Sequence, residues 1–131
     1  MIVRSLKNRM GTKYDIKGDT WQSVRLLLKE DQMGFSFHIT TIFAGTKTKL
    51  WYKHHLESVY CMEGKGRIQD LASGKYYDIE PGVVYALDQH DRHILIADTE
   101  LKLACVFNPP CTGNETHDKD GSYTLQAEAL A

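Results

Sequence analysis

The stretch GTKTKLWYKHHLESVYCMEG, from Gly45 to Gly64, holds two histidines and a glutamate in a segment that otherwise alternates as a β-strand does. Glu57, Val59 and Cys61 occupy every second position and therefore share one face of an extended strand. The glycines at Gly64 and Gly66 predict a hairpin turn into a following strand. Whether this stretch binds a metal, and through which side chains, bears directly on function.

Further segments carry the residue pattern of strands. In residues 35–45, FSFHITTIFAG, the apolar Phe37 and Ile39 fall on one face, with His38 and Thr40 on the other. We predict a strand in WQSVRLLLKED, residues 21–31, from its aromatic and β-branched start, although its composition also suits a helix. The remaining segments are GKYYDIEPGVVYALD, residues 74–88, and HILIADTELKLACVF, residues 93–107. Short strands at close spacing with Gly-rich turns predict an all-β sandwich or barrel.

Length and composition predict a single domain over residues 1–131. A formal net charge of -1 gives no basis for a nucleic-acid partner, and no apolar run has membrane-spanning length. Charges interrupt the apolar residues of the N-terminus, so it lacks the core of a secretory signal. The three cysteines show no paired spacing and fit reduced thiols in the cytoplasm. The polar residues from Cys111 onward predict a mobile C-terminal flap, at about 109–131.

The opening stretch resembles the first motif of the cupin superfamily of small β-barrels, G-x5-H-x-H-x3-E-x6-G. Gly45, Glu57 and Gly64 fall on the motif with every spacing kept, whereas Trp51 and Lys53 occupy the two histidine positions. His54 and His55 lie just beyond these positions, and neither replaces the missing pair in register. The stretch therefore supplies Glu57 alone as a candidate metal ligand.

The second cupin motif, G-x5-P-x-G-x2-H-x3-N, resembles the segment that begins at Gly74. Tyr85 takes its histidine position and Gln89 its asparagine position. His93 follows eight residues after Tyr85, across the turn DQHDR. If Tyr85 and His93 lie on adjacent strands joined by that turn, their side chains can face each other. Alternation places both residues, like Glu57, on faces with apolar neighbours.

Glu57, Tyr85 and His93 would offer a metal one carboxylate oxygen, one phenol oxygen and one imidazole nitrogen. Three protein ligands with open positions are typical of a catalytic site, here a variant of the non-haem iron site. The phenol, whose reference pKa is about 10, must ionise to bind well. Taken singly, the three residues also fit a surface acid, a core tyrosine and a loop histidine. Their joint placement favours the metal site.

Several longer stretches resemble one cupin family, the ectoine synthases, over residues 1 to about 123. They are RLLLK, MGFSFHITTIFAGT, HHLESVYCMEG, YALDQHDRH, CVFNPPCTG and HDKDGSY. Ser58, Cys111 and the tail LQAEALA depart from the family's pattern. The resemblance implies a lyase that closes N-γ-acetyl-L-2,4-diaminobutyrate to the compatible solute ectoine, with loss of water, under osmotic stress. It also implies an iron-containing cytoplasmic homodimer, with zinc as an alternative metal.

The resemblance assigns Glu115 and His117, on the flap, to amine binding and proton transfer. For Arg25 we expect a pairing with the substrate carboxylate, although a surface ion pair would also explain it. The remaining expected substrate contacts are two hydroxyls and three pocket-lining side chains: Thr40, Tyr52, Trp21, Cys105 and Phe107. Tyr52 is also counted among the catalytic residues. Core packing is the alternative for Trp21, and a nucleophilic role for Cys105 is not expected because no partner pattern accompanies it.

Two other functions remain open from the residues. Another metal-dependent cupin enzyme would share the barrel and the site but make a different product. A non-catalytic, ligand-binding cupin would bind without turnover, and such modules usually carry a DNA-binding domain for which no residues remain here.

Overall fold

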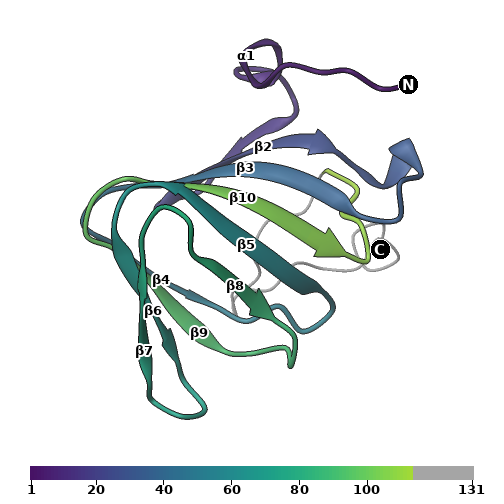
Figure 1. Ribbon diagram of the computed structural model, residues 1–131. Helices are drawn as coiled ribbons and strands as arrows, with labels where there is room; N and C mark the ends of the chain where they lie inside the picture. Colours follow the sequence, from purple (N-terminus) through teal and green to yellow (C-terminus); the bar gives the residue numbers. More distant parts are fainter. Residues whose placement is uncertain (114–131) are drawn as a thin grey trace.

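The computed structural model describes residues 1–113, in which ten strands form two antiparallel sheets that face each other (Figure 1). The six-stranded sheet has the order β1 (Asp15–Lys17), β2 (Trp21–Leu27), β3 (Ser36–Ile42), β10 (Leu101–Asn108), β5 (Leu56–Glu63), β8 (Val84–Leu87). The four-stranded sheet has the order β4 (Thr46–Leu50), β9 (His93–Ala97), β6 (Gly66–Asp70), β7 (Tyr76–Ile79). The all-β prediction is confirmed.

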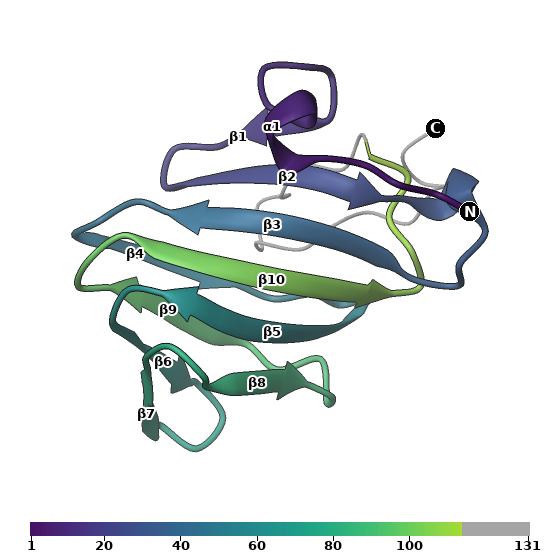
Figure 2. The ribbon, with the colours of Figure 1, turned by 45° about the horizontal axis from the view of Figure 1, so that its top comes forward.

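Two short helical turns complete the described residues. Helix α1 (Leu6–Arg9) lies outside the sheets beside β1 and β2 (Figure 2), and a 3-10 turn, η1 (Lys29–Asp31), follows β2. No helix within residues 1–113 is long and apolar enough to cross a membrane. The predicted strand in WQSVRLLLKED is confirmed over Trp21–Leu27.

The core lies between the two sheets and follows from strand alternation. On β5 the buried residues are Glu57, Val59 and Cys61, while the residues between them are exposed. The four-stranded sheet adds an apolar wall of buried side chains: Leu50, Ile68, Ile79, Leu95 and Ala97. Burying one such side chain stabilises the fold by about 1.5–3 kcal/mol.

The predicted hairpin at Gly64–Gly66 is wrong, because β5 and β6 belong to different sheets. The chain crosses from one sheet to the other there, close to the backbone of two other strands. A Cβ added to Gly64 would collide with the carbonyl oxygen of Glu100, and one added to Gly66 would collide with that of Ile96. Gly64 also has φ +95°, so this crossing needs glycine for both conformation and space.

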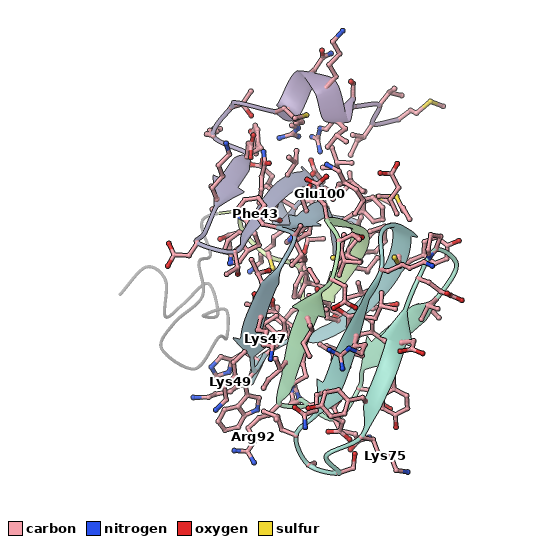
Figure 3. The ribbon with its side chains drawn as sticks, turned by 90° about the vertical axis from the view of Figure 1, so that its left-hand side faces the viewer. Phe43, Lys47, Lys49, Lys75, Arg92 and Glu100 are labelled. Atoms are coloured by element: carbon pink, nitrogen blue, oxygen red, sulfur yellow. The ribbon has the colours of Figure 1, made fainter. Side chains whose placement is uncertain are left out.

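The expected adjacency of the strands carrying Tyr85 and His93 is also wrong. β8 pairs with β5, whereas β9 lies between β4 and β6. The loop of residues 88–92 therefore joins the two sheets instead of forming a hairpin, and Tyr85 and His93 belong to opposite walls. Figure 3 shows Phe43 and Glu100 near one end of the strands and Lys49 and Arg92 near the other, with Arg92 in this loop.

Candidate metal centre and active site

Glu57 and Tyr85 lie on neighbouring strands of the six-stranded sheet. In the β5–β8 ladder Glu57 is opposite Leu87 and Val59 is opposite Tyr85, so the two candidate ligands are diagonal neighbours on one face of the sheet. Only 8% of Glu57 is exposed. Both residues line a small interior cavity.

His93 enters from the opposite sheet, where it begins β9 and pairs with Leu50 and Asp70. Its side chain is 1% exposed, and its Nδ1 lies 2.9 Å from the carbonyl oxygen of Asp91. A carbonyl only accepts, so Nδ1 carries the proton and Nε2 keeps its lone pair. Nε2 is buried and has no hydrogen-bond partner among residues 1–113. This is the tautomer that a metal-binding histidine uses.

Burial keeps all three groups uncharged when no cation is near. It raises the pKa of Glu57 to about 8, partly opposed by a hydrogen bond with Cys105. Burial, with the Glu57 charge adding to it, raises the pKa of the Tyr85 phenol well above its ordinary value. Burial also lowers the pKa of His93, which favours neutral imidazole. A divalent cation would offset the desolvation of the carboxylate and the phenolate, so this donor set fits a metal ion.

The metal hypothesis depends on the phenol. Among residues 1–113 no three His, Cys, Asp or Glu side chains gather closely enough to hold a metal ion. Tyr85 provides the link between the other two groups, since it lines the interior cavity together with Glu57 and a second cavity together with His93. The assignment of Glu57, Tyr85 and His93 as ligands stays a prediction.

The two cavities differ in size and in openness to solvent. The interior one measures about 30 Å³, which is room for about one or two water molecules. The second measures about 450 Å³ and opens between the edge strands β7 and β8. Because the interior cavity is so small, a substrate can enter it only if some lining side chains move.

The structure brings five of the expected substrate-binding residues to the interior cavity: Trp21, Thr40, Tyr52, Cys105 and Phe107. Tyr52 and Phe107 meet edge to face, with ring centroids 5.2 Å apart. The thiol of Cys105 lies 3.7 Å from the hydroxyl of Thr40, and burial raises the pKa of Cys105 well above its ordinary value. A thiol that resists ionisation is a poor nucleophile, in agreement with the sequence expectation.

Arg25 lies away from this lining, in a fully buried position on β2. Its Nε donates to the hydroxyl of Ser23 at 3.1 Å, and its Nη1 donates to the carbonyl oxygen of Gly113 at 3.0 Å. The alternative of an exposed surface ion pair is therefore wrong. The fork of donors instead connects the six-stranded sheet to the start of the predicted flap.

The start of the predicted flap, residues 111–113, is hydrogen-bonded to other parts of the protein. The backbone N–H of Cys111 donates to Ser36 at 3.0 Å, and the carbonyl oxygen of Cys111 accepts from the N–H of Lys29 at 2.8 Å. Gly113 has φ +108°, and a Cβ there would press on Leu28. These contacts attach residues 111–113 to the six-stranded sheet and to the turn after β2, and the mobility of the flap stays a prediction. Glu115 and His117 lie outside the described residues.

Sequence reasoning missed two buried histidines beside the site. His38 faces inward on β3 between Arg25 and Cys105, is fully buried, and has no hydrogen-bond partner for either nitrogen among residues 1–113. His55 is 2% exposed and meets the ring of Phe107 edge to face at 5.8 Å. The alternation in residues 35–45 already placed His38 and Thr40 on the face opposite Phe37 and Ile39. It could not show that the more polar face is the inner one.

The protein has the cupin fold. Its two antiparallel sheets face each other, Gly45 and Gly64 stand at the two ends of the first cupin motif, and Glu57 points inward. A predicted oxalate decarboxylase from Thermotoga maritima shares this fold, with a TM-score of 0.60 at 22% identity over 68% of this chain and 80% of that chain. A sequence model described as ectoine synthase matches residues 1–127. The chain therefore belongs to the ectoine synthase family of lyases.

Individual relatives agree over nearly the full length. An L-ectoine synthase of Saccharophagus degradans is 56% identical over 130 residues, covering 99% of this chain and 98% of the relative. One from Desulfatibacillum aliphaticivorans is 58% identical and covers 95% of this chain and 98% of the relative. The crystal structure of ectoine synthase from P. lautus superposes with a TM-score of 0.87 at 51% identity, covering 95% of this chain and 91% of that chain.

Proposed function

We propose that this protein closes N-γ-acetyl-L-2,4-diaminobutyrate to ectoine with loss of water, using a metal held by Glu57, Tyr85 and His93. The observation that carries the metal is the buried Nε2 of His93, which has a lone pair and no hydrogen-bond partner within residues 1–113. The substrate comes from the family, whose members are named L-ectoine synthase. Iron is the metal proposed, with zinc as the alternative. When bound, such a metal supplies Lewis acidity toward an amide carbonyl.

The ring closure sets demands that this chain's residues can meet. The substrate's α-amine attacks its own acetamide carbon and forms a C–N bond in a six-membered ring. The carbonyl oxygen then leaves as water with two protons from the amine and amide nitrogens. Positioning the two ends of an extended molecule contributes several kcal/mol to such a reaction. The buried rings of Trp21, Tyr52 and Phe107 wall the cavity, favour a folded substrate and exclude bulk water.

Proton transfer is assigned to Glu115 and His117, together with the hydroxyl of Tyr52. The α-amine must be neutral to attack, which requires a base, and the leaving oxygen requires an acid. The hydroxyl of Thr40 offers a further hydrogen bond to the substrate. Arg25, whose guanidinium is anchored to Ser23 and Gly113, is proposed as the partner of the substrate carboxylate.

The cellular setting follows from the same family membership. We propose that the enzyme works in the cytoplasm and makes a compatible solute under osmotic stress. A homodimer is supported by apolar side chains on the outer face of the six-stranded sheet. Tyr60 is 48% exposed and Val84 60% exposed, and the two are direct partners in the β5–β8 ladder. Exposed apolar neighbours of this kind are typical of an interface.

The test pairs metal analysis of the purified protein with detection of ectoine from the acetylated diamine. We expect Glu57→Ala, Tyr85→Ala and His93→Ala each to lose bound metal together with on the order of 100-fold or more in turnover. Glu115→Ala and His117→Ala should lose turnover but keep the metal. Ile94→Val, a conservative change beside His93, is the control. Full metal content and turnover in the three ligand variants, or undiminished turnover after thorough chelation, would contradict the proposal.

A further inference from the structure

The backbone around Tyr52 lies just beyond the end of a sheet. The β4–β9 ladder ends at the pair Leu50–His93, and residues 51–55 are not part of a strand. The Tyr52 side chain is nevertheless 4% exposed and lies inside the barrel. Its ring centroid is 6.2 Å from that of His93. The position of the Tyr52 ring therefore depends on contacts outside the ladders.

One such contact comes from the loop of residues 88–92. The Nδ1 of His90 lies 2.9 Å from the backbone carbonyl oxygen of Tyr52. Since a carbonyl only accepts, the His90 Nδ1 must donate. His90 has φ +51°, in the left-handed region that few non-glycine residues adopt. The turn is braced by the N–H of Gln89, which donates to the Asp91 carboxylate at 3.1 Å.

The same loop makes two more contacts on either side of this one. The guanidinium of Arg92 lies 5.5 Å from the centre of the Trp51 ring, next to Tyr52 in the chain. The carbonyl oxygen of Asp91 accepts from Nδ1 of His93 at 2.9 Å. Consecutive loop residues thus bind the backbone of Tyr52 and the imidazole of His93.

We propose that His90 is a positioning residue, which fixes Tyr52 relative to His93 through its hydrogen bond to the Tyr52 carbonyl oxygen. The role follows because the loop binds both the backbone of Tyr52, through His90, and the imidazole of His93, through Asp91. If the loop loses its contact with Tyr52, the distance between the Tyr52 and His93 rings changes. The left-handed conformation at residue 90 directs the imidazole toward Tyr52. The inference rests on the proposed cyclisation, in which Tyr52 faces the substrate.

Three substitutions separate the hydrogen bond from the backbone conformation. His90→Asn keeps a donor at the place of Nδ1, and asparagine tolerates positive φ. His90→Gly keeps the conformation but loses the donor, and His90→Leu loses both. We expect His90→Asn to stay within about threefold of the wild-type kcat, and the other two to lose roughly 10- to 100-fold in kcat. Bound metal should be unchanged in all three, because Asp91 still holds His93. Gln89→Ala, an exposed neighbour in the same loop, is the control.

A double variant tests whether His90 acts through Tyr52. In a Tyr52→Phe background, His90→Leu should cause little further loss of kcat, because the hydroxyl that His90 positions is already gone. Wild-type turnover in His90→Leu and His90→Gly would overturn the inference. So would equal losses in His90→Asn and His90→Leu, a loss of metal with turnover, a full additional loss in the double variant, or a lower melting temperature with unchanged kinetics.

Amide hydrogen exchange reads the contact without reference to turnover. Exchange across residues 51–53 should be faster in His90→Leu and His90→Gly than in the wild type and His90→Asn. Unchanged exchange in His90→Leu overturns the positioning role whatever the activity. If the wild-type protein fails to form ectoine while the exchange differences appear, the cyclisation is the part that is wrong.

Discussion

The two sheets differ in how many polar side chains they bury. The four-stranded sheet presents buried aliphatic side chains such as Leu50, Ile68 and Leu95, and His93 is its one buried polar or charged residue. The six-stranded sheet contains buried polar residues on three of its strands, among them Arg25, His38 and Glu57. Burial of such groups costs stability unless each is partnered. The four-stranded sheet is thus mainly a packing wall, and the six-stranded sheet carries the groups suited to chemistry.

The largest effects are expected from one substitution on each of the two sheets. Leu95→Ala, on the apolar wall, should destabilise the protein by about 2–5 kcal/mol because it leaves a cavity. The folded fraction should keep its metal, because Leu95 offers no ligand atom. Glu57→Gln, on the polar wall, should lose both metal and turnover. The metal-free protein should be no less stable than the metal-free wild type, because an ionisable group has left a buried position.

Denaturant unfolding of the metal-free proteins, with metal analysis of each variant, measures both effects. Val59→Ile, a small change on the β5 face that carries Glu57, is the control for disturbance of the strand. A Leu95→Ala protein that keeps its stability but loses its metal would show that the apolar wall takes part in the site.

A smaller effect is expected from the pH dependence of His38. Burial, with the charge of Arg25 and the nearby His55 adding to it, lowers the pKa of His38 well below 6.5. Below pH 6.5 His38 binds a proton in the unfolded chain but stays neutral in the folded protein. The free energy of unfolding therefore falls as the pH falls. The wild type should lose up to about 1.4 kcal/mol per pH unit more than His38→Asn between about pH 6 and pH 5. Parallel stability curves for the two proteins would mean that folded His38 accepts the proton.

The smallest effect belongs to a polar contact at the outside of the six-stranded sheet. Arg4 pairs with Asp31 at 2.6 Å, and Arg4 lowers the pKa of Asp31 to about 2. The pair is stabilising above pH 4 and is lost as the pH falls from about 4 to about 2. Asp31→Asn should cost about 1 kcal/mol or less at pH 7, because Arg4 is partly solvated. The difference from the wild type should vanish in acid, and a constant difference down to pH 2 would contradict the ion-pair account.

The sequence by itself determined which residues of a strand share a face. The two-residue period placed Glu57, His93 and Phe107 inward, and the structure buries all three. The spacing of Gly45, Glu57 and Gly64 indicated the cupin fold, and the longer stretches indicated the family. These features are local, because alternation is set by the geometry of the extended chain.

Only the tertiary structure decided which strands pair and what each inner face contains. A hairpin and a crossing between sheets can carry the same alternation and the same glycines, so the predictions for Gly64–Gly66 and for Tyr85 beside His93 were wrong. The buried His38 and the contact of His90 with Tyr52 likewise depend on residues distant in the chain. Such pairings follow from how two sheets close over one core, a balance of burial and chain entropy that no short segment determines.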